Sequence, residues 1–140
     1  MAVATAAKRT TAENLHQIGE VAELVGLSLR TVRYYEEVGL LSAPARTEGG
    51  FRLYGAEHID QLLLIKQMKP LGFSIEEMRA LFDAREVLAS NTSARKRAEA
   101  SKSLEGFAEL ASERCRDLRK QLRSAERFSR QIRSEAEGAD

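Results

Sequence analysis

Apolar residues first recur at helical spacing after Gln17. They stand three or four positions apart and are Ile18, Val21, Ala22, Leu24 and Val25. This spacing predicts an amphipathic helix, and Gly26 directly after it tolerates the positive φ with which many helices end. The preceding residues 1–14 are small, polar and aperiodic, so we expect a disordered arm there.

A second short helix is predicted from Ser28, whose hydroxyl suits an N-cap, to Gly39, which ends it. Its buried residues are expected to be Leu29, Val32 and Val38. Two short helices joined by a turn of about three or four residues that includes a glycine are typical of a helix-turn-helix. Such helix pairs also occur as plain packing units, so this pattern alone leaves both interpretations open.

The stretch 46–54 predicts a short β-hairpin with Gly49 and Gly50 at its turn. Within it, Arg52 is expected to face the opposite side from its two neighbours, because side chains alternate along a strand. A hairpin that directly follows a helix-turn-helix is a wing. The hairpin therefore favours a winged helix-turn-helix over a plain helix pair.

Two further helices are predicted after the hairpin. The first covers about 56–68 and stops before Pro70. Its core-facing residues are expected to be Ile59, Leu62, Leu63, Ile65 and Met68. The second opens with Ser74 and Glu77, which fit a capping box. Residues 15–90 are therefore expected to form one winged helix-turn-helix DNA-binding domain in a mainly α protein.

Residues 93–133 carry a heptad repeat. One core position of the heptad holds Leu104, Ala111, Leu118, Ala125 and Ile132, and the other holds Ala108, Cys115, Leu122 and Ser129. About three to four heptads at this spacing predict a coiled-coil dimerisation helix. The sequence leaves the number and orientation of the paired helices open. We expect a disordered tail at 134–140.

The composition narrows the class of protein. A net charge of +1 over 140 residues does not suggest a nucleic-acid binder, although a local cationic face is sufficient to bind a polyanion. No apolar run approaches the roughly 18–20 residues of a membrane-spanning helix, no signal peptide is visible, and a single cysteine fits a reducing cytoplasm. With two histidines and no glycine-rich phosphate loop, we expect neither an enzyme nor a cofactor or metal site.

Three segments stand out by their order and spacing. They are SLRTVRYYEEVGLL at 28–41, RTEGGFRLY at 46–54 and LGFSIEE at 71–77. Together they closely resemble the DNA-binding domain of the MerR family of bacterial transcription regulators. The resemblance implies a homodimer that binds a pseudo-palindromic promoter, with the second helix in the major groove and the wing on the flanking backbone. It also implies that the bound promoter is bent and undertwisted for RNA polymerase.

Carried over to matching positions, the resemblance implies a set of DNA contacts. They are Arg30, Thr31, Arg33, Tyr34 and Tyr35 around the recognition helix, Arg52 and Tyr54 on the wing, and Lys66 and Lys69 on the third helix. Arginine can bind a guanine edge through two hydrogen bonds, and hydroxyl groups suit phosphate oxygens. Of the adjacent tyrosines, one is expected to point into the core and one outward. Glu36 and Glu37, which end the same helix, are interpreted as structural or charge-balancing.

Several alternatives stay open at this point. An architectural or excisionase-like protein would use the same winged unit to bend DNA without polymerase, and a protein-interaction module would use mainly the coiled coil. Cys115 fits a packed position on the coiled-coil seam, and an interchain disulfide is the alternative. His16 and His58 are expected at the surface or at helix starts. The effector, the operator and the sign of regulation are not encoded in a recognisable motif.

Overall fold

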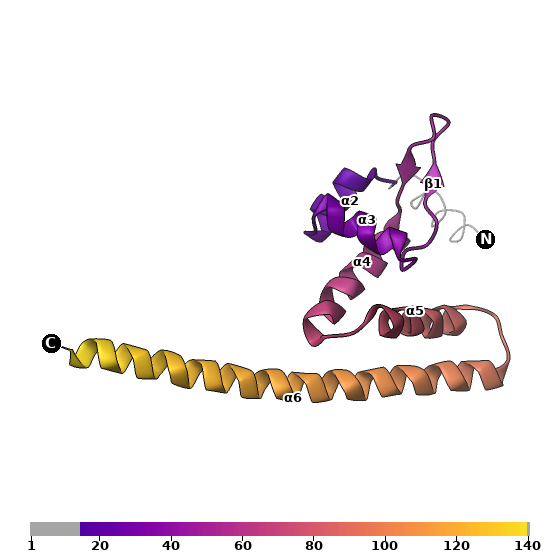
Figure 1. Ribbon diagram of the computed structural model, residues 1–140. Helices are drawn as coiled ribbons and strands as arrows, with labels where there is room; N and C mark the ends of the chain where they lie inside the picture. The colour runs from indigo at the N-terminus through magenta and orange to yellow at the C-terminus, as the bar shows by residue number, and fades with distance from the viewer. Residues whose placement is uncertain (1–14, 140) are drawn as a thin grey trace, which may run out of the picture. The chain divides into compact units, whose positions relative to one another are not determined.

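The computed structural model describes residues 15–139, which are mainly helical (Figure 1). The elements in chain order are α2 (Ile18–Val25), α3 (Leu29–Glu37), β1 (Ala45–Arg46), β2 (Arg52–Leu53), α4 (Ala56–Met68), the 3-10 turn η1 (Lys69–Leu71), α5 (Ile75–Ala89) and α6 (Ala94–Gly138). The described chain divides into two compact units, 15–83 and 84–139. The expected arm at 1–14 lies outside the described residues.

Helices α2 and α3 form the predicted helix-turn-helix. α2 ends at Gly26, which adopts φ 71°, and the Lys66 ammonium donates a hydrogen bond to the Val25 carbonyl at 2.9 Å. α3 begins after Ser28, whose hydroxyl accepts a hydrogen bond from the Thr31 amide at 3.1 Å. Both helix ends therefore follow from local residue chemistry, a left-handed glycine and a serine cap, as predicted.

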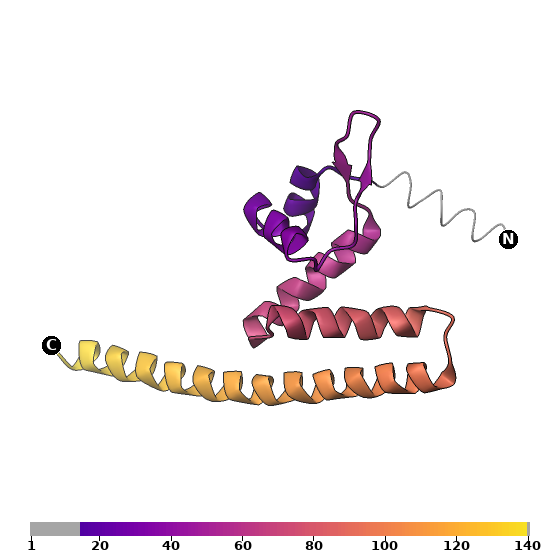
Figure 2. The ribbon, with the colours of Figure 1, turned by 45° about the vertical axis from the view of Figure 1, so that its right-hand side comes forward.

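The hairpin also forms where it was predicted. β1 and β2 are antiparallel, with Arg46 opposite Arg52, and Gly50 adopts φ 84° in the turn. Figure 2 shows the hairpin projecting beyond the short helices beside it. A second backbone pairing was not predicted: the amide of His16 donates to the Tyr54 carbonyl and the amide of Tyr54 to the His16 carbonyl, each at 2.8 Å. This pairing ties the start of the described chain to the base of the wing.

The first unit has a continuous apolar core. Its side chains with less than 2% exposure are Val21, Val25, Val32, Tyr54, Leu62, Ile65 and Met78. Two expected core residues are exposed, Leu29 by 37% and Leu63 by 42%, and two more, Val38 and Ile59, are only half-buried. Leu62 and Leu63 are consecutive and point about 100° apart on the helix, so α4 buries only one of them. Leu29 is the first residue of α3, so its side chain lies at the edge of the packed part of the helix.

The junction between α4 and α5 lies at the helix-breaking residues of the sequence. Pro70 lies in η1, and Gly72 ends that turn with φ 76°. The predicted capping box opens α5, because the Ser74 amide donates to the Glu77 carboxylate at 3.0 Å and the Glu77 amide donates to the Ser74 hydroxyl at 3.1 Å. Both boundaries were therefore predictable from short-range signals.

The second unit consists of the end of α5 and the long helix α6. The Ser93 hydroxyl caps α6 by accepting a hydrogen bond from the Lys96 amide at 3.2 Å, and the helix runs unbroken to Gly138 (Figure 2). It therefore continues beyond Arg133, where we expected a disordered tail to begin. The added residues 134–138 include the good helix formers Glu135, Ala136 and Glu137, and a Gln131–Glu135 hydrogen bond of 3.1 Å joins them to the preceding turn. No helix among residues 15–139 is long and apolar enough to span a membrane.

Candidate nucleic-acid interface

The exposed face of α3 carries cations and one aromatic ring. Arg30, Arg33 and Tyr34 are exposed, whereas Val32 and Tyr35 are buried in the core of the first unit. The rings of the two tyrosines lie 5.4 Å apart at an interplanar angle of 56°. The expectation of one inward and one outward tyrosine is confirmed, and Tyr34 is the outward one. This face presents guanidinium and hydroxyl groups, the donors that bind base edges and phosphates.

Two of the expected DNA contacts require correction because their side chains belong to the core. Tyr35 is only 3% exposed, and Tyr54 is fully buried. Neither ring offers a surface on which a phosphate group can lie. Adjacent helix residues point about 100° apart, so Tyr35 enters the core while Tyr34 stays outside. Tyr54 follows β2 on the same side of the strand as Arg52, and both side chains reach Glu36. Their hydrophobic rings are large enough to dominate the packing of a small domain.

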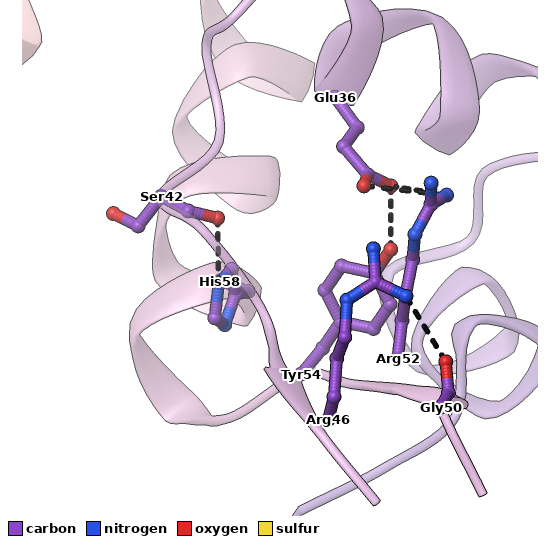
Figure 3. Close-up of polar contacts among 7 residues, drawn as sticks. All are labelled: Glu36, Ser42, Arg46, Gly50, Arg52, Tyr54 and His58. Carbon is purple, nitrogen blue, oxygen red and sulfur yellow. Dashed lines mark hydrogen bonds and ion pairs between the residues drawn. The ribbon is translucent and has the colours of Figure 1, made fainter.

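Tyr54 instead connects the wing to the recognition helix. Its hydroxyl donates to the Glu36 carboxylate at 2.5 Å, and the guanidinium of Arg52 lies 3.3 Å from the same carboxylate (Figure 3). Burial, together with the neighbouring Glu36 carboxylate, raises the pKa of Tyr54 to about 12. The hydroxyl therefore stays protonated and able to donate at neutral pH. Glu36 was expected to be structural or charge-balancing, and in the structure it pairs with the positive charge of Arg52 on the wing.

The wing carries a second cation that the sequence reasoning did not include among the contacts. Arg46 is the register partner of Arg52, so two guanidinium groups share one face of the hairpin. Arg46 also donates to the Gly50 carbonyl at 3.0 Å, which ties it to the turn (Figure 3). Both arginines are exposed. Their symmetric positions about the glycine turn were a signal that would have revealed this pair.

The remaining expected contacts occupy mixed positions. Lys66 is exposed, but its ammonium group caps the C-terminal end of α2 and so has a structural role. Lys69 is exposed at the end of α4. The Thr31 hydroxyl lies 2.8 Å from the Ser28 hydroxyl, within the first turn of α3. Contact of these three residues with DNA stays a prediction.

His58 lies in the first turn of α4 but is buried, unlike an ordinary surface residue. Its Nδ1 accepts a hydrogen bond from the Gly55 amide at 3.0 Å, and its Nε2 lies 3.0 Å from the Ser42 carbonyl. The ring also makes an edge-on contact with Tyr54, with centroids 5.2 Å apart. His58 therefore fixes the loop that precedes the wing. Among residues 15–139 the structure contains no group of three or more potential metal ligands.

In the second unit, the predicted dimerisation residues lie along α6. Leu104, Ala111 and Cys115 are half-buried within the single chain, whereas Ala108, Leu118, Leu122 and Ala125 are exposed. Cys115 is a free thiol. The larger apolar side chains in the C-terminal half of α6 are between 42% and 65% exposed; they are Leu118, Leu122, Phe128 and Ile132. Within the described chain, this stripe therefore lacks an apolar surface to cover it.

The first unit thus has the architecture of a winged helix-turn-helix DNA-binding domain. Comparison with known families places it more narrowly, because residues 17–85 match the model of the MerR HTH family of regulatory proteins. By this match the DNA-binding unit of the chain belongs to the MerR family. The family resemblance predicted from the three sequence motifs is confirmed.

Individual relatives agree with this assignment. The mercuric resistance operon regulatory protein of Bacillus cereus is 45% identical over 65 residues, which cover 46% of this chain and 49% of that protein. Among solved structures, a MerR-family transcriptional regulator from Bacillus cereus is 27% identical with a TM-score of 0.54, covering 82% of this chain and 75% of that one. The lead(II) complex of the regulator PbrR691 from Ralstonia metallidurans is 28% identical with a TM-score of 0.51, covering 80% and 86%.

The family match at residues 17–85 covers the DNA-binding part of the chain. The chain spans about half the length of the mercuric resistance regulator and one third of the nodulation protein NolA from Bradyrhizobium, which is 41% identical over 78 residues.

Proposed function

We propose that this protein is a sequence-specific transcription regulator that binds a pseudo-palindromic promoter site as a homodimer. The observation that carries the proposal is the division of α3 into two faces. Val32 and Tyr35 anchor the helix in the core, and this leaves Arg30, Arg33 and Tyr34 on its exposed face. A helix of this kind, next to a cationic wing, suits the major groove and the flanking phosphates.

The wing supports the same function. Arg46 and Arg52 place two guanidinium groups on one face of the hairpin, where they suit phosphate oxygens rather than base edges. Phosphate contacts fix the register of a protein on DNA, and base contacts supply the specificity. We infer that α3 reads the sequence and that the wing fixes the orientation.

A second copy of the chain is the inferred partner of α6. The exposed stripe of Leu118, Leu122 and Ile132 has the heptad spacing of a coiled-coil seam. Two identical DNA-binding units would match the two halves of a palindromic site. The relatives with matching domains are transcription regulators, which favours this function over an architectural protein or a simple interaction module.

We further propose that binding deforms the promoter so that RNA polymerase can use it. Bending or untwisting a site of this size costs on the order of 1–10 kcal/mol. Two half-sites held by one stiff dimer provide opposing anchor points against this cost. α6 is a single unbroken helix from Ala94 to Gly138, which supports such stiffness.

A DNase I footprint on the DNA upstream of the protein's own gene, at near-physiological salt, tests the proposal. We expect a protected dyad between the −35 and −10 promoter elements, with hypersensitive cleavage at its centre. A variant with both Arg30→Ala and Arg33→Ala is expected to lose this protection while it remains folded. If no dyad is protected, and the protein binds uniformly along the DNA in a way that added salt abolishes, then binding is nonspecific and the proposal is contradicted.

A further inference from the structure

Glu36 is a carboxylate in the region where the proposed function places DNA. It lies in the last turn of α3, and its side chain is 17% exposed. An unpaired carboxylate beside phosphates is repulsive. In this structure, however, the carboxylate is engaged by two wing residues, the hydroxyl of Tyr54 and the guanidinium of Arg52 (Figure 3).

The two residues that contact Glu36 differ in exposure, and we therefore assign them different roles. Tyr54 is fully buried, so its hydroxyl requires an acceptor inside the protein, and Glu36 supplies it. Arg52 keeps 47% of its side chain exposed, and one of its terminal nitrogens faces Glu36 at 3.3 Å. A guanidinium has five N–H donors in a planar fork. Several of them therefore stay available to a phosphate while the contact with Glu36 persists.

We propose that Glu36 is a positioning residue for the wing, acting on DNA through Arg52 without touching DNA. The Glu36 carboxylate fixes the Arg52 guanidinium relative to α3, so that recognition helix and wing engage the duplex in one register. A long side chain that is already held in place loses less conformational freedom when it binds. This inference rests on the proposed function and adds a specific role for a residue that makes no DNA contact.

The neighbouring residue provides a matched control. Glu37 has the same side chain and charge, is exposed, and makes no side-chain hydrogen bond or ion pair to any residue in the described chain 15–139. Glu36→Gln and Glu37→Gln therefore change the net charge equally. Glu36→Gln also retains an amide oxygen that can accept the buried Tyr54 hydroxyl, so the core keeps its hydrogen bond.

The test is a double-mutant cycle with Glu36→Gln and Arg52→Gln. The probe is the duplex that the wild-type protein selects from a randomised pool, and a scrambled duplex of equal length is the comparison. We expect each single change to weaken binding to the selected duplex roughly five- to tenfold, and the double variant to bind as weakly as Arg52→Gln alone. The slope of log Kd against log salt should also fall by about 0.9 in both single variants, as for one lost phosphate contact.

Glu37→Gln is expected to bind the selected duplex as well as the wild type or slightly better. Two results would overturn the inference: additive losses in the double variant, or equal losses from Glu36→Gln and Glu37→Gln. Melting temperatures show whether Glu36→Gln folds. If it does not, the same cycle in a Tyr54→Phe background removes the hydroxyl that depends on residue 36, and the same two results apply.

The proposed function and this inference fail in different ways. If the wild-type protein selects no sequence and binds the scrambled duplex equally well, the proposed regulator fails and the inference is overturned with it. If the wild-type protein binds its selected duplex tightly but the cycle is additive, the function stands and only the role of Glu36 is refuted.

Discussion

The two units of this protein bury their apolar residues in opposite ways. In the unit at 15–83, the large side chains of Leu62 and Ile65 are fully buried within the chain itself. In the unit at 84–139, the only residues below 9% exposure are Ala84 and Ala100, while larger apolar side chains stay exposed along α6. The first unit buries its large apolar side chains within the chain, whereas the second leaves its large apolar side chains exposed.

This difference separates two kinds of sequence information. A folded domain exposes some apolar surface, and single exposed leucines need no explanation. A stripe at heptad spacing is different, because its periodicity has no use in an isolated helix and matches the seam of a coiled coil. We therefore interpret the first unit as complete for recognition and the second as the part that requires another helix.

The largest expected effect comes from breaking the seam. Changing Leu118 and Leu122 together to Glu removes four leucines from a dimer and buries charge in their place. The loss is about 6 kcal/mol or more, at roughly 1.5–3 kcal/mol for each buried leucine. Light scattering should show a monomer, and circular dichroism should show reduced helix content. The matched changes Arg116→Glu and Lys120→Glu, off the seam, should leave a dimer. A dimeric seam variant would contradict our assignment of α6.

The core of the first unit can be tested with two adjacent leucines. Leu62 is fully buried and Leu63 is 42% exposed. Leu62→Ala is expected to lower the free energy of unfolding by about 2–5 kcal/mol, because it leaves a cavity. Leu63→Ala should cost less than about 1 kcal/mol. Urea denaturation measures both values. If both changes lower the free energy of unfolding equally, Leu63 is buried in solution. The first unit would then also have an apolar side chain that is exposed only in the single chain, and it would differ less from the second unit.

DNA recognition should depend on the first unit more than on the second. Arg30→Ala or Arg33→Ala is expected to cost about 1–3 kcal/mol in specific DNA binding, which is roughly 5- to 150-fold in Kd. Arg116→Ala, an exposed arginine of α6, removes the same charge and should change the Kd about twofold or less. Fluorescence anisotropy at fixed salt compares them. If all three variants lose affinity equally, binding follows total charge and α3 is not the reading helix.

The smallest effect tests how the helix-turn-helix is built. Gly26 has φ 71°, and a Cβ atom there would lie 2.8 Å from the Lys66 ammonium, so Gly26→Ala should destabilise the protein by about 1 kcal/mol. Gly19 lies in α2 with open space around it, and Gly19→Ala should be neutral or stabilise by up to about 1 kcal/mol. Thermal unfolding distinguishes the two. A stabilising Gly26→Ala would show that the turn does not require a left-handed residue.

Much of the fold was predictable because its signals are local. Ser28, Gly26 and the Ser74–Glu77 capping box act within a few residues of their own positions, so the helix boundaries follow directly from the sequence. The family motifs then identified the class of protein before its geometry was known. The end of α6 was harder to predict, because a helix ending has no marker where every residue from Ser134 to Glu137 tolerates a helix.

The sequence by itself determined the elements, their order and the cationic character of α3 and the wing. Only the tertiary structure decided which of the expected contacts face outward, since burial depends on residues that are distant in the chain. It placed Tyr54 in the core, joined Glu36 to Arg52, and paired Arg46 across the hairpin. These are long-range contacts, and no local pattern specifies the partner of a side chain that folding brings close.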